Sequence, residues 1–235
     1  IIRGDALSFP KIFIDTIKIT KNHGPIIVDS SNLDMAKFNQ GISTIYSDIN
    51  LAFKWVAHQP TTEITAFYMM NHATNYSEFK NALEYYHCPV QNFVYADIKG
   101  NIAMHHNGKI PIRCENYNKH VLYGNSSQYV WDEFIPFDEL PNELNPKRGF
   151  VSSANQYPIP NEVDYYYLPG VYWPAHRANR INNMLYGSIQ DRVATIENMK
   201  NIQNDNFNKY AQDILPYLLS QELRNKINND SLLIR

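Results

Sequence analysis

The sequence predicts an α+β fold, in which groups of strands and groups of helices occupy separate stretches of the chain. Short segments rich in Ile, Phe, Val and Thr, bounded by turn residues, gather near the start and again in the centre. Segments with a helical spacing of apolar residues lie between these groups and near the end. The 235 residues leave room for one sizeable domain or two small ones, and they contain no internal repeat.

The first group of strands predicts a hairpin. Residues 11–20 alternate in part between apolar and polar side chains, as a half-exposed strand does. The turn residues 21–25 follow, and residues 26–28 begin a second strand. After a polar stretch, residues 49–58 are expected to form a third strand, which Gln59-Pro60 ends.

Two helices are expected next. Residues 63–70 have helical character. Asn75 resembles an N-cap, with Glu78 three residues later as in a capping box. Apolar residues then recur at i, i+3, i+4 and i+7, which predicts an amphipathic helix that Cys88-Pro89 ends. These apolar residues are Phe79, Ala82, Leu83 and Tyr86.

The centre of the chain predicts a second hairpin. Residues 92–97 and 102–106 read as strands, and residues 99–101 as the turn that joins them. Asn107-Gly108 is a second turn signal, after which residues 110–113 continue. Residues 116–148 are expected to form an irregular, packed loop.

The last third of the chain predicts one more strand and then helices. Residues 149–155 are expected to form a short inner strand. Ala175 begins a helix that reaches about Leu185. Residues 207–218 carry an apolar stripe that is typical of a late amphipathic helix.

The composition excludes several function classes. The net charge of -2 argues against a nucleic-acid partner, which would require a basic patch. No apolar run reaches the roughly 20 residues of a membrane span, so we expect no membrane partner. Cys88 and Cys114 are too few for a disulfide scaffold. The glycine-rich phosphate loops and the H-E-x-x-H, C-x-x-C and G-x-S-x-G motifs are missing, which argues against nucleotide enzymes, metalloenzymes and α/β-type serine hydrolases.

The nearest approach to a metal-binding pair is His105-His106. Adjacent side chains on a strand point to opposite faces of the sheet, so we expect these two histidines not to share an ion. Asparagine accounts for 28 of the 235 residues, so an asparagine in a motif is weak evidence unless its context supports it.

Several short blocks carry a family resemblance through their order and compatible spacing. They are residues 23–27, 92–97, 100–102, 108–113, 153–155, 172–181 and 202–205. Together they resemble the penicillin acylase (penicillin amidase) family. The resemblance extends over nearly the whole chain, whereas the chain corresponds only to a middle portion of that family's much longer precursor.

The resemblance implies an N-terminal-nucleophile (Ntn) hydrolase with an αββα sandwich. Members cut themselves to expose a serine at the start of the large subunit. The serine hydroxyl attacks an amide carbonyl, its own α-amine acts as the base, and water then hydrolyses the acyl-enzyme. Ile1 is not such a nucleophile, and the family's order places the nucleophile upstream of it.

Both ends of the chain look cut from something longer: it begins without Met and stops on an apolar stretch. We therefore expect residues 1–235 to be a single partial domain, a portion of the large subunit that is inactive alone. The expected partners are the remaining segments of the same precursor, namely the small subunit and the nucleophile-bearing start of the large subunit. The expected ligand is a small-molecule N-acyl amide, and the sequence indicates no cellular location.

Two residues match the family's active-site positions. Asn155 matches the oxyanion-hole asparagine, whose side-chain amide would donate a hydrogen bond to the developing oxyanion. Arg177 matches the active-site arginine, placed at a helix start 22 residues later, where its charge would orient the asparagine and keep the nucleophile's amine neutral. The fixed separation within two matching blocks distinguishes Asn155 from the other asparagines.

Four further residues are given structural roles. Asp97 is expected to close the turn at Lys99-Gly100, and Arg180 to be a solvated charge on its helix. Gln203 and Asp205 are expected to cap or bridge the late helices, although the family keeps a Gln and an Asp there.

No cofactor is expected. Some relatives bind calcium through a backbone carbonyl that matches Pro111 and an aspartate after the oxyanion asparagine. Asp164 lies near that place, but an ungapped alignment puts Tyr166 there. One carboxylate and one carbonyl are a poor set for an ion that requires six to eight oxygens.

Two other hypotheses remain open at this point. In the first, the chain is a relative that kept the fold as a non-catalytic binding or structural module. In the second, it is an unrelated α+β domain whose motif matches are accidental. The second hypothesis predicts that Asn155 and Arg177 lie far apart.

Overall fold

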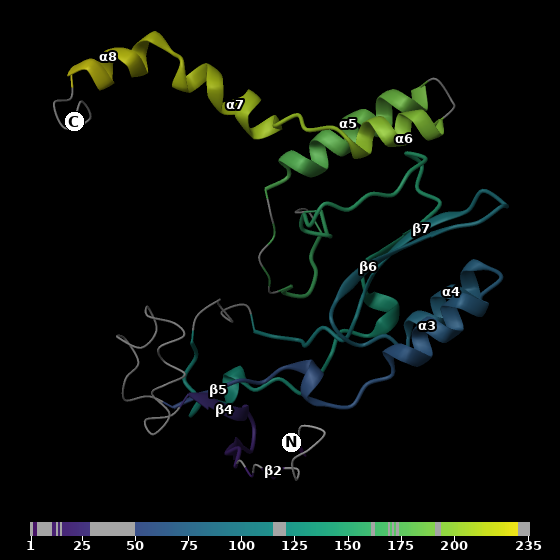
Figure 1. Ribbon diagram of the computed structural model, residues 1–235, viewed down its shortest axis with the longest axis vertical. Coiled ribbons are helices and arrows are strands. Elements are labelled where there is room, and N and C mark those ends of the chain that lie inside the picture. Colours follow the sequence, from purple (N-terminus) through teal and green to yellow (C-terminus); the bar gives the residue numbers. More distant parts are fainter. Residues whose placement is uncertain are drawn as a thin grey trace.

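The structure is a computed structural model, and its described residues form a two-stranded pair and a small three-stranded sheet near the N-terminus, a central sheet and a set of helices (Figure 1). It describes residues 2–3, 11–12, 14, 16–28, 50–114, 121–160, 163–168, 170, 172, 174–190 and 194–229. No helix within these ranges is both long and apolar enough to cross a membrane.

The predicted N-terminal hairpin is confirmed. Strand β3 (Ile19–Thr20) pairs antiparallel with β4 (Gly24–Val28), and β4 pairs with β5 (Leu51–Ala52). The first predicted strand is broken: β2 (Lys11–Ile12) pairs instead with β1 (Ile2–Arg3), and residues 16–18 are irregular and exposed. Phe13, Asp15 and Ile49, which belong to the predicted strands, lie outside the described residues.

The third predicted strand is much shorter than expected. After β5 the chain turns into a 3₁₀ helix, η1 (Val56–His58). The aromatic rings of Phe53, Trp55 and His58 pack on one another within 6.2 Å, which favours this compact turn over an extended strand.

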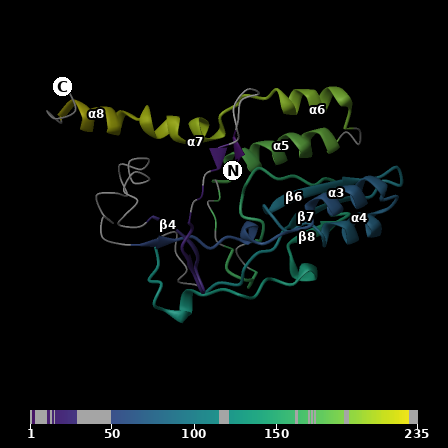
Figure 2. The same ribbon diagram turned by 60° about the horizontal axis from the view of Figure 1, so that its bottom comes forward.

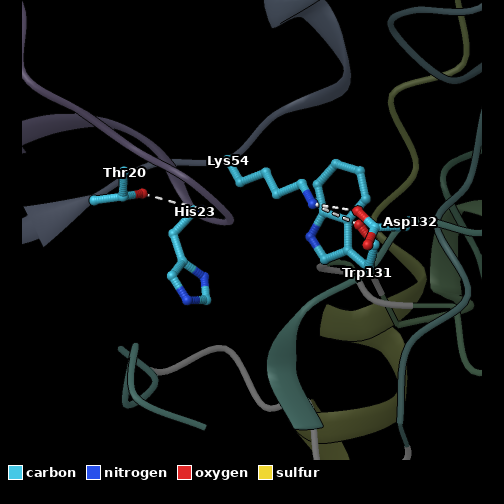
Figure 3. Close-up of polar contacts among 5 residues, drawn as sticks. All are labelled: Thr20, His23, Lys54, Trp131 and Asp132. Carbon is cyan, nitrogen blue, oxygen red and sulfur yellow. Dashed lines mark hydrogen bonds and ion pairs between the residues drawn. The ribbon is translucent and has the colours of Figure 1, made fainter. Parts of the chain in front are cut away.

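Polar contacts tie the small sheet to the segment 121–135 (Figure 3). The Lys54 Nζ donates to the Trp131 carbonyl at 2.6 Å and to Asp132 Oδ1 at 2.9 Å, and it lies 4.4 Å from the Trp131 ring centroid. On the hairpin, Thr20 Oγ1 accepts from the His23 backbone N–H at 3.0 Å. The His23 Nε2 lies 2.8 Å from the Gly124 carbonyl oxygen. These contacts attach the β3–β4 turn, through His23, and the residue stretch after β5, through Lys54, to the segment 121–135.

The two predicted helices are present as α3 (Glu63–His72) and α4 (Tyr76–Leu83). The Asn75 side chain accepts from the Glu78 backbone N–H at 3.0 Å, as the capping pattern predicts. Helix α4 ends three residues before the predicted Tyr86, which is nevertheless buried in a turn beneath it. Buried Ala82 and Leu83 complete the apolar face of α4.

The central sheet has the order β6-β7-β8 and is antiparallel throughout. Strands β6 (Gln91–Ala96) and β7 (Ile102–Asn107) form the predicted hairpin. Strand β8 (Asn142–Leu144) lies in the stretch predicted to be irregular. The sequence does not reveal this strand, because its three residues pair only with β7 and lack a periodic pattern of their own.

One face of this sheet packs against α3 and α4. Phe93 and Tyr95 lie opposite His105 and Ala103 in the ladder, and their rings contact Tyr86 and Phe79. Asn107, on the same face, donates from Nδ2 to the carbonyls of Leu83 and Tyr86 at 2.9 and 3.2 Å. The other face is turned towards α5 and α6, so the central sheet lies between two pairs of helices (Figures 1 and 2).

The two adjacent histidines point to opposite faces of β7, as predicted. His105 is 1% exposed and stacks on Phe137 with ring centroids 5.1 Å apart. His106 faces the other side, where its Nδ1 lies 2.7 Å from Asn92 Oδ1.

Residues 110–113, which follow the second turn signal, form part of a packed core and no regular strand. Pro111 makes an isolated antiparallel bridge with Phe134. The core cluster beside it consists of Ile110, Ile135, Leu140 and Leu168.

The C-terminal third is helical. The predicted helices are α5 (His176–Gln190), which extends five residues beyond the predicted Leu185, and α7 (Lys209–Leu218). Helices α6 (Ile196–Gln203) and α8 (Gln221–Asn229) had no predicted counterpart, because their sequences are mostly polar.

The predicted inner strand at residues 149–155 is wrong. The segment joins no sheet and ends in a bend at Ala154 and Asn155. Asn155 has a φ of 64°, a left-handed conformation that cannot continue a strand.

Candidate functional site

The structure brings the two predicted active-site residues together. Arg177 lies in the first turn of α5, and its Nη1 donates to Asn155 Oδ1 at 3.4 Å. Both side chains are exposed. A contact between residues 22 positions apart, on two different structural elements, requires the bend and the start of α5 to lie side by side.

The backbone at Asn155 is unusual for a residue with a side chain. Its φ is 64°, and among the described residues other than glycine only Asn145, at 50°, also has a positive φ. Asparagine enters this conformation more readily than other residues with a Cβ, because its short amide can bond locally. The Asn155 Oδ1 accepts from Arg177. The Asn155 Nδ2 makes no hydrogen bond with another described residue and can donate to a ligand.

The bend packs against α5 through apolar groups. Phe150 is 7% exposed and its ring meets that of Tyr186, on α5, at a centroid distance of 4.9 Å. Ala154, in the bend, and Ala178, on α5, are also buried. The Ala154 backbone N–H donates to Gln156 Oε1 at 2.7 Å, which holds the bend locally.

Arg180 differs from the prediction that it is a solvated charge. Its Nε and Nη2 donate to the two carboxylate oxygens of Asp205 at 2.9 and 2.7 Å, and its guanidinium lies 4.5 Å from the Phe207 ring centroid. The hydrogen bond from Arg180 lowers the pKa of Asp205. Asp205 therefore bridges α5 to the connection between α6 and α7, as predicted for that residue.

Comparison with known proteins then identifies the family. The model of the family described as penicillin amidase matches residues 13–233, nearly the whole chain. The chain belongs to the penicillin amidase family. The hypothesis of an unrelated α+β domain with accidental motif matches is therefore wrong.

Two curated proteins are similar to parts of this chain. The penicillin G acylase of Escherichia coli is 30% identical over 67 residues, which are 28% of this chain and 8% of that protein. The acyl-homoserine lactone acylase QuiP of Pseudomonas syringae pv. syringae (strain B728a) is 26% identical over 148 residues, 63% of this chain and 18% of that protein. The matched regions thus span less than a fifth of either relative.

A solved structure confirms the fold class. The thermostable penicillin G acylase from Alcaligenes faecalis superposes with a TM-score of 0.64 at 20% identity, over 94% of this chain and 37% of that chain. The chain accordingly has the α+β fold of that penicillin acylase structure.

Other residues in the family blocks have structural roles. The Asp97 carboxylate closes the predicted turn by accepting from the backbone N–H groups of Lys99 and Asn101, both at 2.9 Å, and from the side chains of Asn101 and Tyr95. The Asn101 amide is the main cause that lowers the pKa of Asp97. Asp97 therefore fixes the hairpin between β6 and β7.

The described residues do not fit a calcium ion at the place that the resemblance suggests. Tyr166 occupies the matched position, and its hydroxyl donates to Glu139 Oε2 at 2.5 Å. Asp164 is exposed, and Pro111 is buried beside Phe134. Within the described part of the chain no three His, Cys, Asp or Glu side chains gather as a metal site would require.

Sequence reasoning missed the polar residues that surround the bend. Ser152, Ser153 and Asn182 make side-chain hydrogen bonds there, and Asn92 reaches it from the sheet. Their only sequence signal was that Asn92 and Ser153 stand inside matched family blocks. The abundance of asparagine concealed Asn92 and Asn182.

Proposed function

We propose that this chain is part of an amidohydrolase that cleaves N-acyl amide bonds through an acyl-enzyme. The observation that supports this most directly is the contact between Arg177 Nη1 and Asn155 Oδ1 in a chain of the penicillin amidase family. The arginine occupies the amide oxygen and so leaves the amide N–H groups of Asn155 to face a substrate.

The proposed role of Asn155 is to stabilise the oxyanion. When a nucleophile attacks an amide carbonyl, negative charge develops on the carbonyl oxygen, and a prepositioned N–H donor lowers the energy of that transition state by about 3 kcal/mol. Arg177 contributes a fixed positive charge beside the Asn155 side chain and favours the neutral form of a nearby amine.

The proposed nucleophile is a serine at the start of the large subunit, upstream of Ile1. Its oxygen attacks the carbonyl carbon while its own α-amine takes the hydroxyl proton. The tetrahedral intermediate collapses, the leaving amine receives that proton, and an ester remains. Water then attacks the ester with the α-amine as base, which releases the carboxylic acid and restores the serine.

The proposed substrate class is N-acyl amides, with the acyl group unspecified. Penicillins and N-acyl homoserine lactones both belong to it, and they correspond to the named activities of the two curated relatives. The remaining segments of a longer protein would complete the site and the acyl pocket.

Asn155→Gly in the complete protein tests the proposal. Glycine removes the amide yet adopts a positive φ at no cost, so the fold is retained while the donor is lost. We expect kcat on an N-acyl amide reporter to fall roughly 100- to 1,000-fold with an unchanged melting temperature. Asn125→Gly, at an exposed loop asparagine, is the control.

A near-normal rate in Asn155→Gly would show that Asn155 is not the oxyanion donor. A complete protein that hydrolyses no N-acyl amide, and whose residue at the self-cleavage junction is not Ser, Thr or Cys, would instead be a non-catalytic relative that kept the fold for binding.

A further inference from the structure

A chain of hydrogen bonds crosses the sheet face that is turned towards the bend. Asn92 on β6 and His106 on β7 stand directly opposite in the ladder, and His106 Nδ1 lies 2.7 Å from Asn92 Oδ1. Asn92 Nδ2 donates onward to Ser153 Oγ at 2.7 Å. Because the Asn92 amide nitrogen is the donor to Ser153, its oxygen must accept, which assigns a proton to His106 Nδ1.

The bend is also attached on its other side. Ser152 Oγ donates to Asn182 Oδ1, on α5, at 2.6 Å. The consecutive residues Ser152 and Ser153 thus reach opposite partners, one on the helix and one on the sheet. Hydrogen bonds therefore attach the segment before Asn155 to β6 on one side and to α5 on the other.

These attachments stand close to the proposed active-site pair. Ser153 precedes Asn155 by two residues, and Asn182 follows Arg177 by five residues on α5. The contact between Asn155 and Arg177 is long, at 3.4 Å, and lies between exposed side chains. A long hydrogen bond between exposed side chains does little to fix the positions of those two side chains. The shorter bonds of 2.6 and 2.7 Å on either side of the bend are better suited to set it.

We propose that Asn92, His106 and Asn182 are positioning residues that hold the Asn155 amide in register with Arg177. This inference rests on the proposed function, since it assigns the network a role in transition-state stabilisation. None of the three touches the reacting atoms in this scheme. They act through Ser152 and Ser153, whose place fixes where the bend presents Asn155.

A pair of substitutions at His106 tests this role. An asparagine side chain presents its Nδ2 near the place of the imidazole Nδ1, so His106→Asn keeps a donor for Asn92, whereas His106→Leu keeps the bulk and loses the donor. In the complete protein we expect His106→Leu to lower kcat about tenfold, because small misplacements of catalytic groups are costly, with KM within about twofold. His106→Asn should restore most of the rate.

Two further variants make the result specific. Ser153→Ala removes the acceptor for Asn92 from the bend and should reproduce the kcat loss of His106→Leu, with a smaller risk to folding. Tyr95→Phe removes a hydrogen bond of 3.0 Å to Asp97 on the opposite face of the same sheet and should leave kcat unchanged.

The proposal is overturned if Ser153→Ala keeps the wild-type kcat, or if His106→Asn is as slow as a folded His106→Leu. A second readout separates it from the proposed function. If the complete wild-type protein hydrolyses no N-acyl amide, the proposed function fails. The NMR signals of the Asn155 side-chain amide then test positioning alone: a shift in Ser153→Ala that is absent in Tyr95→Phe supports it, and no shift contradicts it.

Discussion

Arg180 and Asp205 join α5 to the α6–α7 connection through two hydrogen bonds of 2.9 and 2.7 Å, and the Phe207 ring covers the guanidinium. The pair is bidentate, which is the strongest arrangement of these two groups. It stands one turn after Arg177 and thereby fixes the start of the helix that presents it.

Asp205→Asn should lower the melting temperature at pH 7, because it removes the charge that both guanidinium bonds require. Arg180 lowers the pKa of Asp205, so the pair stabilises the folded state above the ordinary aspartate value of 3.8 and this stabilisation is lost as pH falls through the folded pKa. We therefore expect the wild type and Asp205→Asn to differ at pH 7 and to converge below pH 3.8. Thermal melts across that range measure this, and a constant difference would contradict it.

His105 should make the protein sensitive to mild acid. Burial, followed by the nearby charge of Lys80, lowers its pKa from 6.5 to about 4, and neither ring nitrogen has a hydrogen-bond partner among the described residues. In the unfolded chain the His105 imidazole is protonated below about pH 6.5, whereas in the folded chain it stays neutral down to about pH 4. The free energy of unfolding therefore falls as the pH drops through this window.

The expected loss from His105 between pH 7 and pH 5 is about 2 kcal/mol. His105→Leu should be at least as stable as the wild type at pH 7, since it removes two unpaired buried nitrogens, and it should lack this loss. Urea unfolding at the two pH values measures both effects. Equal acid losses in the two proteins would assign the sensitivity to other groups.

Gly24→Ala should be much more harmful than Gly100→Ala. Both glycines have a positive φ, 76° and 85°, so each alanine incurs a backbone cost of roughly 1 kcal/mol. A Cβ at Gly24 would also lie 2.4 Å from the Phe53 carbonyl oxygen, whereas nothing lies within 4 Å of one at Gly100. The difference between the two losses in unfolding free energy therefore measures the clash between β4 and the residue after β5. Equal losses would show that the two strands separate easily there.

The 235-residue chain alone should release no chromophore from an N-acyl amide reporter, because the proposed nucleophile is not among its residues. The control is the complete protein under the same conditions. Turnover by the isolated chain, sensitive to Asn155→Gly, would mean that a nucleophile lies within these residues.

The sequence predicted well the elements whose pattern is local. The helix after Asn75 and the β6–β7 hairpin have a cap, a period and a turn within a dozen residues. Strand β8 and helix α6 were missed, because β8 exists only through its pairing with β7 and α6 is mostly polar. The expected strand at residues 149–155 failed for a related reason: Phe150 packs on Tyr186 of α5, and the segment joins no ladder.

The candidate site divides in the same way. Asn155 and Arg177 could be predicted because family blocks surround each of them, and the structure places them in contact. The bidentate partner of Arg180 could not be predicted, since 25 residues separate it from Asp205 and either side chain alone looks like a surface charge. Long-range polar contacts of this kind have no periodic signal in a sequence.

The left-handed backbone at Asn155 limits what mutation can do at this position. Glycine, asparagine and aspartate are the residues that occupy such a conformation most readily, and of these only asparagine offers a neutral N–H donor. Substitution of this asparagine by serine or lysine would meet the backbone requirement poorly, and substitution by aspartate would place a negative charge where a negative charge must develop. An evolving lineage that needs the oxyanion donor therefore has no gradual route away from asparagine here, whereas a lineage that has lost catalysis is free to accept glycine.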